Sequence, residues 1–190
     1  MTIFPKPQFA RPVVLATLLA VLPAEASGAG AGGERLGLGR TPTEGEISVV
    51  DIDVMPDGRG LPAGEGSVAR GEALYESGCA QCHGVAGQGG VGGALAGAAR
   101  YTPAELAADP SLERTVGNYW PYATSLFDYI RRAMPFDQPG SLADDEVYAL
   151  TAYLLYLNAL VDGSAVINRD TLPQVEMPAR QFYVPASRRE

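Results

Sequence analysis

The chain has 190 residues, of which 46% are hydrophobic, and it carries 14 Lys and Arg against 22 Asp and Glu, a formal charge of −8. This length corresponds to one modest domain with flanking segments rather than to a multidomain enzyme. Proteins that bind the phosphate backbone carry clustered cations. Here the only adjacent cations are Arg131-Arg132 and Arg188-Arg189, so nucleic acid is not expected as a partner.

The N-terminal segment has the parts of a secretory signal peptide. Lys6 and Arg11 are basic, residues 13–22 form an apolar run, and residues 24–26 (Ala-Glu-Ala) form a small-x-small cleavage site. We expect residues 1–26 to be removed by cleavage after Ala26 and the protein to be exported to the periplasm. An uncleaved membrane anchor is the alternative, but about ten apolar residues are too few to span a hydrocarbon core of ~30 Å. No membrane span is expected in the mature protein.

Removal of the signal peptide leaves 12 Arg, no Lys and 21 acidic residues, a formal charge of −9. A partner that docks by charge would therefore present a basic face.

Residues 27–66 are rich in Gly and Pro, and only residues 47–54 (ISVVDIDV) have the composition of a strand. We expect an extended N-terminal arm, because this segment has few large apolar side chains to offset the entropy cost of ordering. The arm is either a disordered leader or a segment that adds a strand to, or wraps around, a partner subunit.

Capping and apolar periodicity predict four helices after this arm. They are expected at residues 67–77, 104–108, 124–133 and 141–160, with Ser67, Thr102 and Ser141 as caps. The last helix carries two apolar stripes, so we expect it to be buried on more than one side. The Gly-rich run at 84–97 excludes regular structure. Residues 162–190 contain three prolines, and we expect an extended C-terminal tail.

The segment Cys79–His83 (CAQCH) has the spacing of a c-type haem attachment motif. Two thiols three positions apart can each add to one vinyl group of the same porphyrin. His83 then lies beneath the iron, where an imidazole nitrogen can coordinate it. The alternatives are a redox-active CxxC pair, which would require a βαβ setting that the sequence lacks, and a zinc site, which would require a second pair of ligands.

The composition also restricts the second axial ligand of the iron. His83 is the only histidine and the mature chain has no Lys, which leaves methionine, a ligand that raises the potential relative to a second His. Met55, Met134 and Met177 are each followed by Pro. We predict Met134, because it lies between two predicted helices, 51 residues after His83, whereas the other two lie in the flexible flanking arms. For each methionine the alternative is apolar packing.

Four features occur in the order typical of one family. They are Gly71 and Tyr75 before CAQCHG, an intermediate helix, AMP at 133–135, and DEVYALTAYLLYLN in the last helix. Together they resemble a class I cytochrome c domain over about residues 67–161. The resemblance implies an all-α fold of three to five short helices around one covalent haem c, with Gly71 and Tyr75 crossing Tyr153. It also implies electron transfer, with no catalytic activity of this chain alone.

A closer resemblance is carried by the segments GLGRTPTEGEISVVDIDVMPDGRGLPAGEGS, YWPYATSLFDYIRRAMPF and LPQVEMP. These are similar to the cytochrome subunits that accompany periplasmic molybdenum sulfite dehydrogenases and the sulfur dehydrogenase of thiosulfate-oxidising systems. The resemblance implies a molybdenum oxidoreductase subunit as electron donor and a downstream cytochrome or oxidase as acceptor. A free-standing electron shuttle and a small haem enzyme such as a peroxidase remain as alternatives.

One departure from the family concerns the orientation of the haem histidine. Class I cytochromes usually place a Pro about ten residues after it, and the carbonyl of that Pro accepts the imidazole Nδ–H. Residues 89–97 (GGVGGALAG) contain no Pro. We therefore expect a backbone carbonyl near Gly93 or Ala94 to take this role.

Further residues are candidates for the haem pocket. Tyr119, Trp120 and Tyr122 are expected either to line it and bind a propionate or simply to pack in the core. Arg131 and Arg132 precede Met134, and one of them, with Arg132 the candidate, would offset a propionate charge. An ordinary solvated helix end with cations at its C-terminus explains both arginines as well. Phe127 and Ile130 are expected to be core residues facing the porphyrin.

Overall fold

The computed structural model describes residues 38–97 and 101–184. The chain divides into two units, Met1–Thr41 and Pro42–Glu190, and every helix and strand of the described residues lies in the second unit. In chain order the elements are α1 (Glu44–Val50), β1 (Glu65–Ser67), α2 (Val68–Gly78), α3 (Ala80–His83), α4 (Pro103–Ala108), α5 (Val116–Tyr119), α6 (Ala123–Ala133), α7 (Asp144–Leu157), β2 (Val166–Asn168) and the 3-10 helices η1 (Leu172–Gln174) and η2 (Pro178–Phe182).

Local capping explains where the shorter helices begin. The Ser67 side chain accepts a hydrogen bond from the Arg70 N–H at the start of α2, as predicted. At the start of α4, Thr102 and Glu105 form the predicted capping box, and Pro103 occupies the first turn.

The longest helix, α7, is shorter than the predicted 141–160. Its N-cap is Ala143, and the carboxylate of Glu146 accepts a hydrogen bond from the Ala143 N–H at 2.9 Å, so the helix starts after Ser141. It ends at Leu157 because the next residue, Asn158, turns its side-chain amide back to the carbonyl of Leu154. The first turn carries three acidic residues, which the helix dipole favours.

The strand predicted within residues 47–54 is wrong: residues 44–50 form helix α1. Thr43 and Glu46 form a capping box in which the Glu46 carboxylate accepts the Thr43 N–H at 2.8 Å. The β-branched composition of ISVV favours a strand, but among the described residues no strand pairs with it, and the capping box nucleates a helix instead. No residue of α1 is buried.

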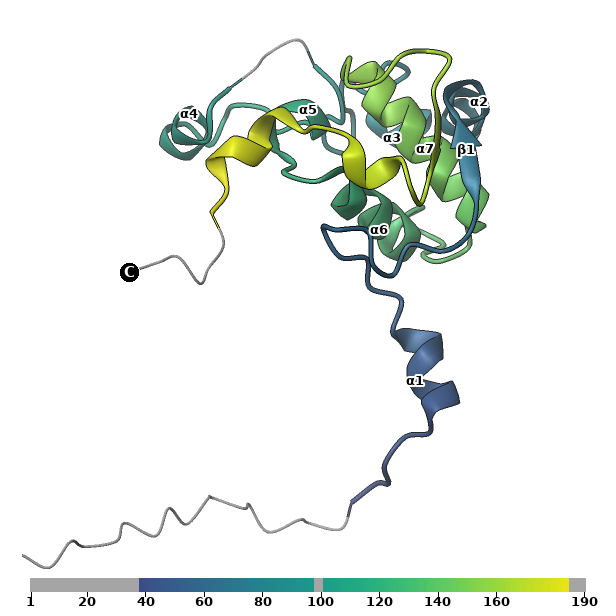
Figure 1. Ribbon diagram of the computed structural model, residues 1–190. Helices are drawn as coiled ribbons and strands as arrows, with labels where there is room; N and C mark the ends of the chain where they lie inside the picture. The colour runs from purple at the N-terminus through teal and green to yellow at the C-terminus, as the bar shows by residue number, and fades with distance from the viewer. Residues whose placement is uncertain (1–37, 98–100, 185–190) are drawn as a thin grey trace, which may run out of the picture. The chain divides into compact units, whose positions relative to one another are not determined.

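Helices α2 and α7 cross at the centre of the core (Figure 1). A Cβ on Gly71 would lie 1.9 Å from the Ala149 carbonyl oxygen and 2.8 Å from Tyr153 Cβ, so only glycine permits this approach. The rings of Tyr75 and Tyr153 are 5.3 Å apart and tilted by 52°. The expected contact of Gly71 and Tyr75 with Tyr153 is confirmed. Residues 147–155 are buried throughout, in agreement with the two apolar stripes.

Both flanking segments pack into this core, whereas the sequence predicts that they extend away from it as arms. Strand β1 pairs antiparallel with β2, with Gly66 opposite Ile167. On the N-terminal side Val54 and Leu61 are buried, and on the C-terminal side Ile167, Leu172, Met177 and Ala179 are buried. The C-terminal segment, yellow in Figure 1, passes α6 and reaches α5. Within the described residues, no helix is both long and apolar enough to cross a membrane.

Candidate haem-binding site

The two thiols lie on a single helical turn directly after α2. Cys79 is the C-cap of α2, and its carbonyl accepts hydrogen bonds from the Cys82 N–H at 3.1 Å and the His83 N–H at 3.0 Å. Residues three apart on such a turn face the same side. Both cysteines are free and half-buried. Burial, and secondly the nearby Cys82, raises the pKa of the Cys79 thiol, which keeps it in the protonated, less reactive form at neutral pH.

His83 is oriented by a backbone carbonyl. Its Nδ1 lies 2.8 Å from the carbonyl oxygen of Gly93. Because a carbonyl only accepts, Nδ1 carries the proton and Nε2 presents its lone pair. The expectation of a carbonyl near Gly93 or Ala94 is confirmed, and the glycine loop supplies what a proline usually supplies.

The glycine loop is folded closely around the imidazole. The Gly92 N–H donates to the Cys82 carbonyl at 2.8 Å, and the Gly89 N–H donates to the His83 carbonyl at 2.8 Å. A Cβ on Gly92 would lie 2.8 Å from His83 Cε1 and 2.9 Å from Nδ1. The loop therefore needs glycine at this position to hold the ring.

The three methionines among the described residues have different surroundings. Met134 is the C-cap of α6, its N–H bonds to the Ile130 carbonyl at 3.1 Å, and its half-buried side chain packs against the core. Met55 is 43% exposed. Met177, expected in a flexible arm, is 4% exposed and belongs to the core. Apolar packing thus accounts for Met177, and Met134 alone combines partial burial with a position between two long helices.

The candidate aromatic residues have partners from other segments. Tyr119 packs edge-on against Tyr183, with ring centroids 6.5 Å apart, and Arg114 lies 5.6 Å from its ring. Arg180 stacks 4.3 Å from the Tyr122 ring. Tyr119 and Tyr122 are therefore joined to the C-terminal segment.

The remaining pocket candidates, Trp120, Phe127 and Ile130, pack in or against the core. Trp120 packs against the core and meets Tyr129 at 5.6 Å. Phe127 and Ile130 are buried, as expected for core residues.

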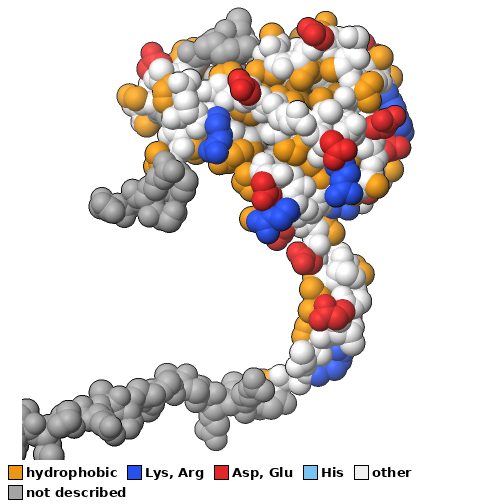
Figure 2. Space-filling model, viewed as in Figure 1, with side chains coloured by type: hydrophobic (Ala, Val, Ile, Leu, Met, Phe, Trp, Pro, Cys, Tyr) orange, Lys and Arg blue, Asp and Glu red, His pale blue; other side chains and the backbone are white. Residues whose placement is uncertain are grey.

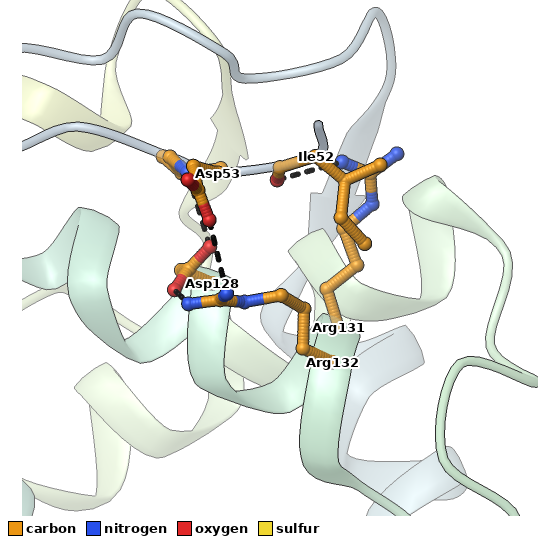
Figure 3. Close-up of polar contacts among 6 residues, drawn as sticks. Ile52, Asp53, Asp128, Arg131 and Arg132 are labelled. Atoms are coloured by element: carbon orange, nitrogen blue, oxygen red, sulfur yellow. Dashed lines mark hydrogen bonds and ion pairs between the residues drawn. The ribbon is translucent and has the colours of Figure 1, made fainter. Parts of the chain in front are cut away.

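Arg132 has two carboxylate partners from the chain itself. Its guanidinium pairs with Asp53 at 3.0 Å and with Asp128, the residue four positions earlier in α6 (Figure 3). Arg131 pairs with Asp144 at 3.2 Å and reaches the Ile52 carbonyl. Cations also lie beside carboxylates elsewhere on the face shown in Figure 2. The i,i+4 spacing of Asp128 and Arg132 predicts their pair; no local pattern predicts Asp53.

The side chains at this site fit a covalently attached haem. Two free thiols lie on one helical turn, and the imidazole that follows them has its Nδ1 engaged and its Nε2 available. A thioether from Met134 lies at the end of a helix that packs against α7. These are the donor types of a c-type haem with a histidine and a methionine ligand.

Comparison with known proteins agrees with this chemistry. The cytochrome c family model matches residues 68–158, from the start of α2 to the C-cap of α7. A chain of the crystal structure of the sulfane dehydrogenase SoxCD from Paracoccus pantotrophus is 41% identical, with a TM-score of 0.70, over 80% of this chain and 73% of that chain. This protein belongs to the cytochrome c family. The cytochrome is of class I and c-type, and it is similar to the matched chain of SoxCD. No curated protein matches it.

Proposed function

We propose that this cytochrome is a periplasmic, monohaem subunit that accepts electrons from the molybdenum subunit of a sulfur or sulfite dehydrogenase. The observation that carries the proposal is the extent of the likeness to the SoxCD chain. It covers 80% of this cytochrome, well beyond the residues 68–158 of the family match. The likeness thus includes flanking segments, which here are folded into the core.

The proposed attachment assigns a role to each donor. Cys79 and Cys82 would hold the haem by thioether bonds, and His83 Nε2 and the Met134 sulfur would ligate its iron. The haem, when bound, supplies a one-electron redox couple. The Gly93 carbonyl fixes the orientation and basicity of the imidazole, and the thioether raises the reduction potential. We propose no acid–base catalysis by this chain alone.

Two features of the sequence support a single haem and a periplasmic location. The chain has two cysteines and one histidine, enough for a single attachment motif. The signal peptide proposed for residues 1–26 lies outside the described residues, and it would deliver the chain to the compartment where haem c is attached. The formal charge of −9 after its removal favours a partner with a basic face, and a downstream cytochrome or oxidase would take the electrons onward.

Axial ligation is tested by replacing each methionine in turn. In the Met134→Ala protein we expect loss of the weak red charge-transfer band that a thioether gives ferric haem, a lower reduction potential and binding of carbon monoxide to the ferrous form. Met55→Ala and Met177→Ala serve as matched controls and should keep the band. A band that survives in Met134→Ala contradicts the assignment.

The partner is tested by purifying the tagged cytochrome from its native host. We expect molybdenum in a fixed ratio to haem, and reduction of the haem when sulfite or carrier-bound sulfur is added. A pure cytochrome without molybdenum, reduced equally well by unrelated donors, would instead establish a free-standing shuttle. A resting ferric form that is high-spin, with an open sixth position, would favour a peroxidase-like enzyme.

A further inference from the structure

Residues 52–56 lie along one face of α6, in the opposite direction to the helix. The contacts recur at positions i, i+4, i+7 and i+8 of α6, which form one helical face. They join Thr124 to the Pro56 carbonyl at 3.4 Å, Asp128 to the Val54 N–H at 3.0 Å, Arg131 to the Ile52 carbonyl at 3.5 Å, and Arg132 to Asp53 at 3.0 Å. The end of α6 that leads to Met134 is thus the end that residues 52 and 53 cover.

Asp128 is the centre of this network (Figure 3). One carboxylate oxygen accepts the Val54 N–H and the other pairs with Arg132. The Asp128 side chain is 14% exposed, whereas those of Arg132 and Asp53 are 46% and 65% exposed. An exposed ion pair such as Arg132–Asp53 contributes little by itself. The contacts of Asp128 are charge-assisted and shielded, so most of the restraint depends on this carboxylate.

The last turn of α6 determines where Met134 lies. Its N–H bonds to the carbonyl of Ile130 at 3.1 Å, so the last turn fixes the point at which the chain leaves the helix, and at Met134 the backbone is extended. The two residues before Ala133 are held from different sides: Arg131 by Asp144 at the start of α7, and Arg132 by Asp128 and Asp53. Helix ends fray when their last turn has no external restraint. Here the restraint comes from α7 and from the N-terminal segment.

We propose that Asp128 is a positioning residue for the methionine ligand. Together with Arg132 and residues 52–54 it holds the last turn of α6, and so keeps the Met134 sulfur on the haem iron. This inference rests on the proposed axial role of Met134. It gives the N-terminal segment a function within the cytochrome itself, separate from any partner.

The test is displacement of methionine by imidazole in the full-length, haem-loaded ferric protein, followed by loss of the red band. In Asp128→Ala we expect half-displacement at an imidazole concentration about tenfold lower than in the wild type, a ratio that corresponds to ~1.4 kcal/mol. Asp128→Asn should give a smaller shift, because its amide oxygen still accepts the Val54 N–H. The amount of covalent haem should not change.

Two controls separate positioning from general stability. Asp57→Asn removes a carboxylate next to residues 52–56, which among the described residues pairs with the exposed Arg59, and its titration should match the wild type. Tyr148→Phe removes a hydrogen bond from α7 to the Pro62 carbonyl, and it should lower the unfolding free energy without shifting the titration.

The positioning role is overturned if Asp128→Ala titrates like the wild type, or if Tyr148→Phe shifts the titration as far as Asp128→Ala does. A red band that persists in Met134→Ala overturns the axial assignment, and with it this inference. A normal Met134→Ala result combined with an unshifted Asp128→Ala overturns the positioning role alone.

Discussion

At the scale of single residues, the site depends on small side chains that let backbone groups approach functional ones. His83 obtains its orientation from the Gly93 carbonyl, and the loop reaches that position only because Gly92 has no Cβ. Asn158 makes a connection of a different kind, because its buried side-chain amide accepts the Gly117 N–H and donates to the Leu95 carbonyl. Asn158 thus joins the end of α7 to the Gly-rich loop at residues 84–97 and to α5.

Gly92→Ala should disturb the haem histidine, whereas Gly93→Ala should not. The new Cβ at position 92 would lie 2.8 Å from His83 Cε1, while nothing lies within 4 Å of a Cβ at position 93. We expect Gly92→Ala to cost about 1–3 kcal/mol of stability and to raise the reduction potential, because a weaker Nδ1 hydrogen bond leaves a less basic ligand. Voltammetry and denaturant unfolding measure both; equal effects of the two variants would contradict the role of Gly92.

Asn158→Ala should be strongly destabilising, by about 3 kcal/mol, since it leaves the buried Gly117 N–H and Leu95 carbonyl without this partner. Asn168 is the control. Its side chain bonds the N–H groups of Asp170 and Thr171 in a partly exposed turn, where water can replace it. Urea unfolding of both variants measures the difference, and a loss below that of Asn168→Ala would show that the Asn158 bonds contribute little.

At the scale of elements, the closest contact is the crossing of α2 and α7, in which Gly71 lies against the Ala149 backbone. This crossing carries the chain directly into the Cys79–His83 turn, so the helix packing determines the position of the haem motif. The hydrogen bond from Tyr75 to the Gly84 carbonyl, at 2.8 Å, continues the connection past His83.

Gly71→Ala should therefore destabilise the fold by about 3 kcal/mol, because a Cβ there would overlap backbone atoms that have no rotamer with which to move away. Gly78→Ala, in the same helix, meets nothing within 4 Å and should be neutral or stabilise by ~0.5 kcal/mol. Thermal unfolding of the two haem-loaded variants tests this pair. Similar midpoints for both would show that α2 and α7 can separate without cost.

The sequence predicts a helix start well where the residues that determine it lie within a few positions of one another. Ser67, Thr102 and Glu105 identify their helix starts, and the CxxCH segment forms a helical turn that suits the proposed haem attachment. The cap of α7 is Ala143, two residues after the predicted Ser141, because Glu146, rather than Asp144, supplies the carboxylate at the cap. Residues 47–50 were misassigned because their β-branched composition outweighed a capping box that begins at Thr43.

At the scale of the whole molecule, contacts between distant segments were not predictable from one sequence. The pairing of β1 with β2 joins residues about a hundred positions apart, and Asp53 reaches Arg132 across 79 positions. Neither contact has a local spacing signature. For the same reason the sequence indicated a propionate for Arg132, whereas the structure gives it two carboxylates from the chain itself.

The pKa values of two buried tyrosines predict how the stability of the fold changes at high pH. Burial is the main cause that raises the pKa of Tyr75 and of Tyr148 from 10.0 to about 12. The folded state favours the neutral phenols, so their contribution is complete below pH 10 and is lost as the pH rises toward 12. We expect the unfolding free energy to fall over this interval.

The replacement Tyr148→Phe should make that fall less steep, because it removes one of the phenols whose pKa is raised in the folded state. Denaturant unfolding from neutral pH to pH 12 measures the slope. An identical slope in the variant and the wild type would show that Tyr148 does not contribute to the alkaline response.

Because the segments on both sides of the haem motif pack into one core, truncation of this protein has a predictable consequence. A fragment cut at residues 68 and 158 would keep the haem motif and Met134, yet it would lose Val54, Leu61, Ile167 and Leu172, all of them buried in the intact chain. The apolar surface uncovered in this way would drive self-association. The smallest well-behaved unit therefore extends at least from Ile52 to Ala179.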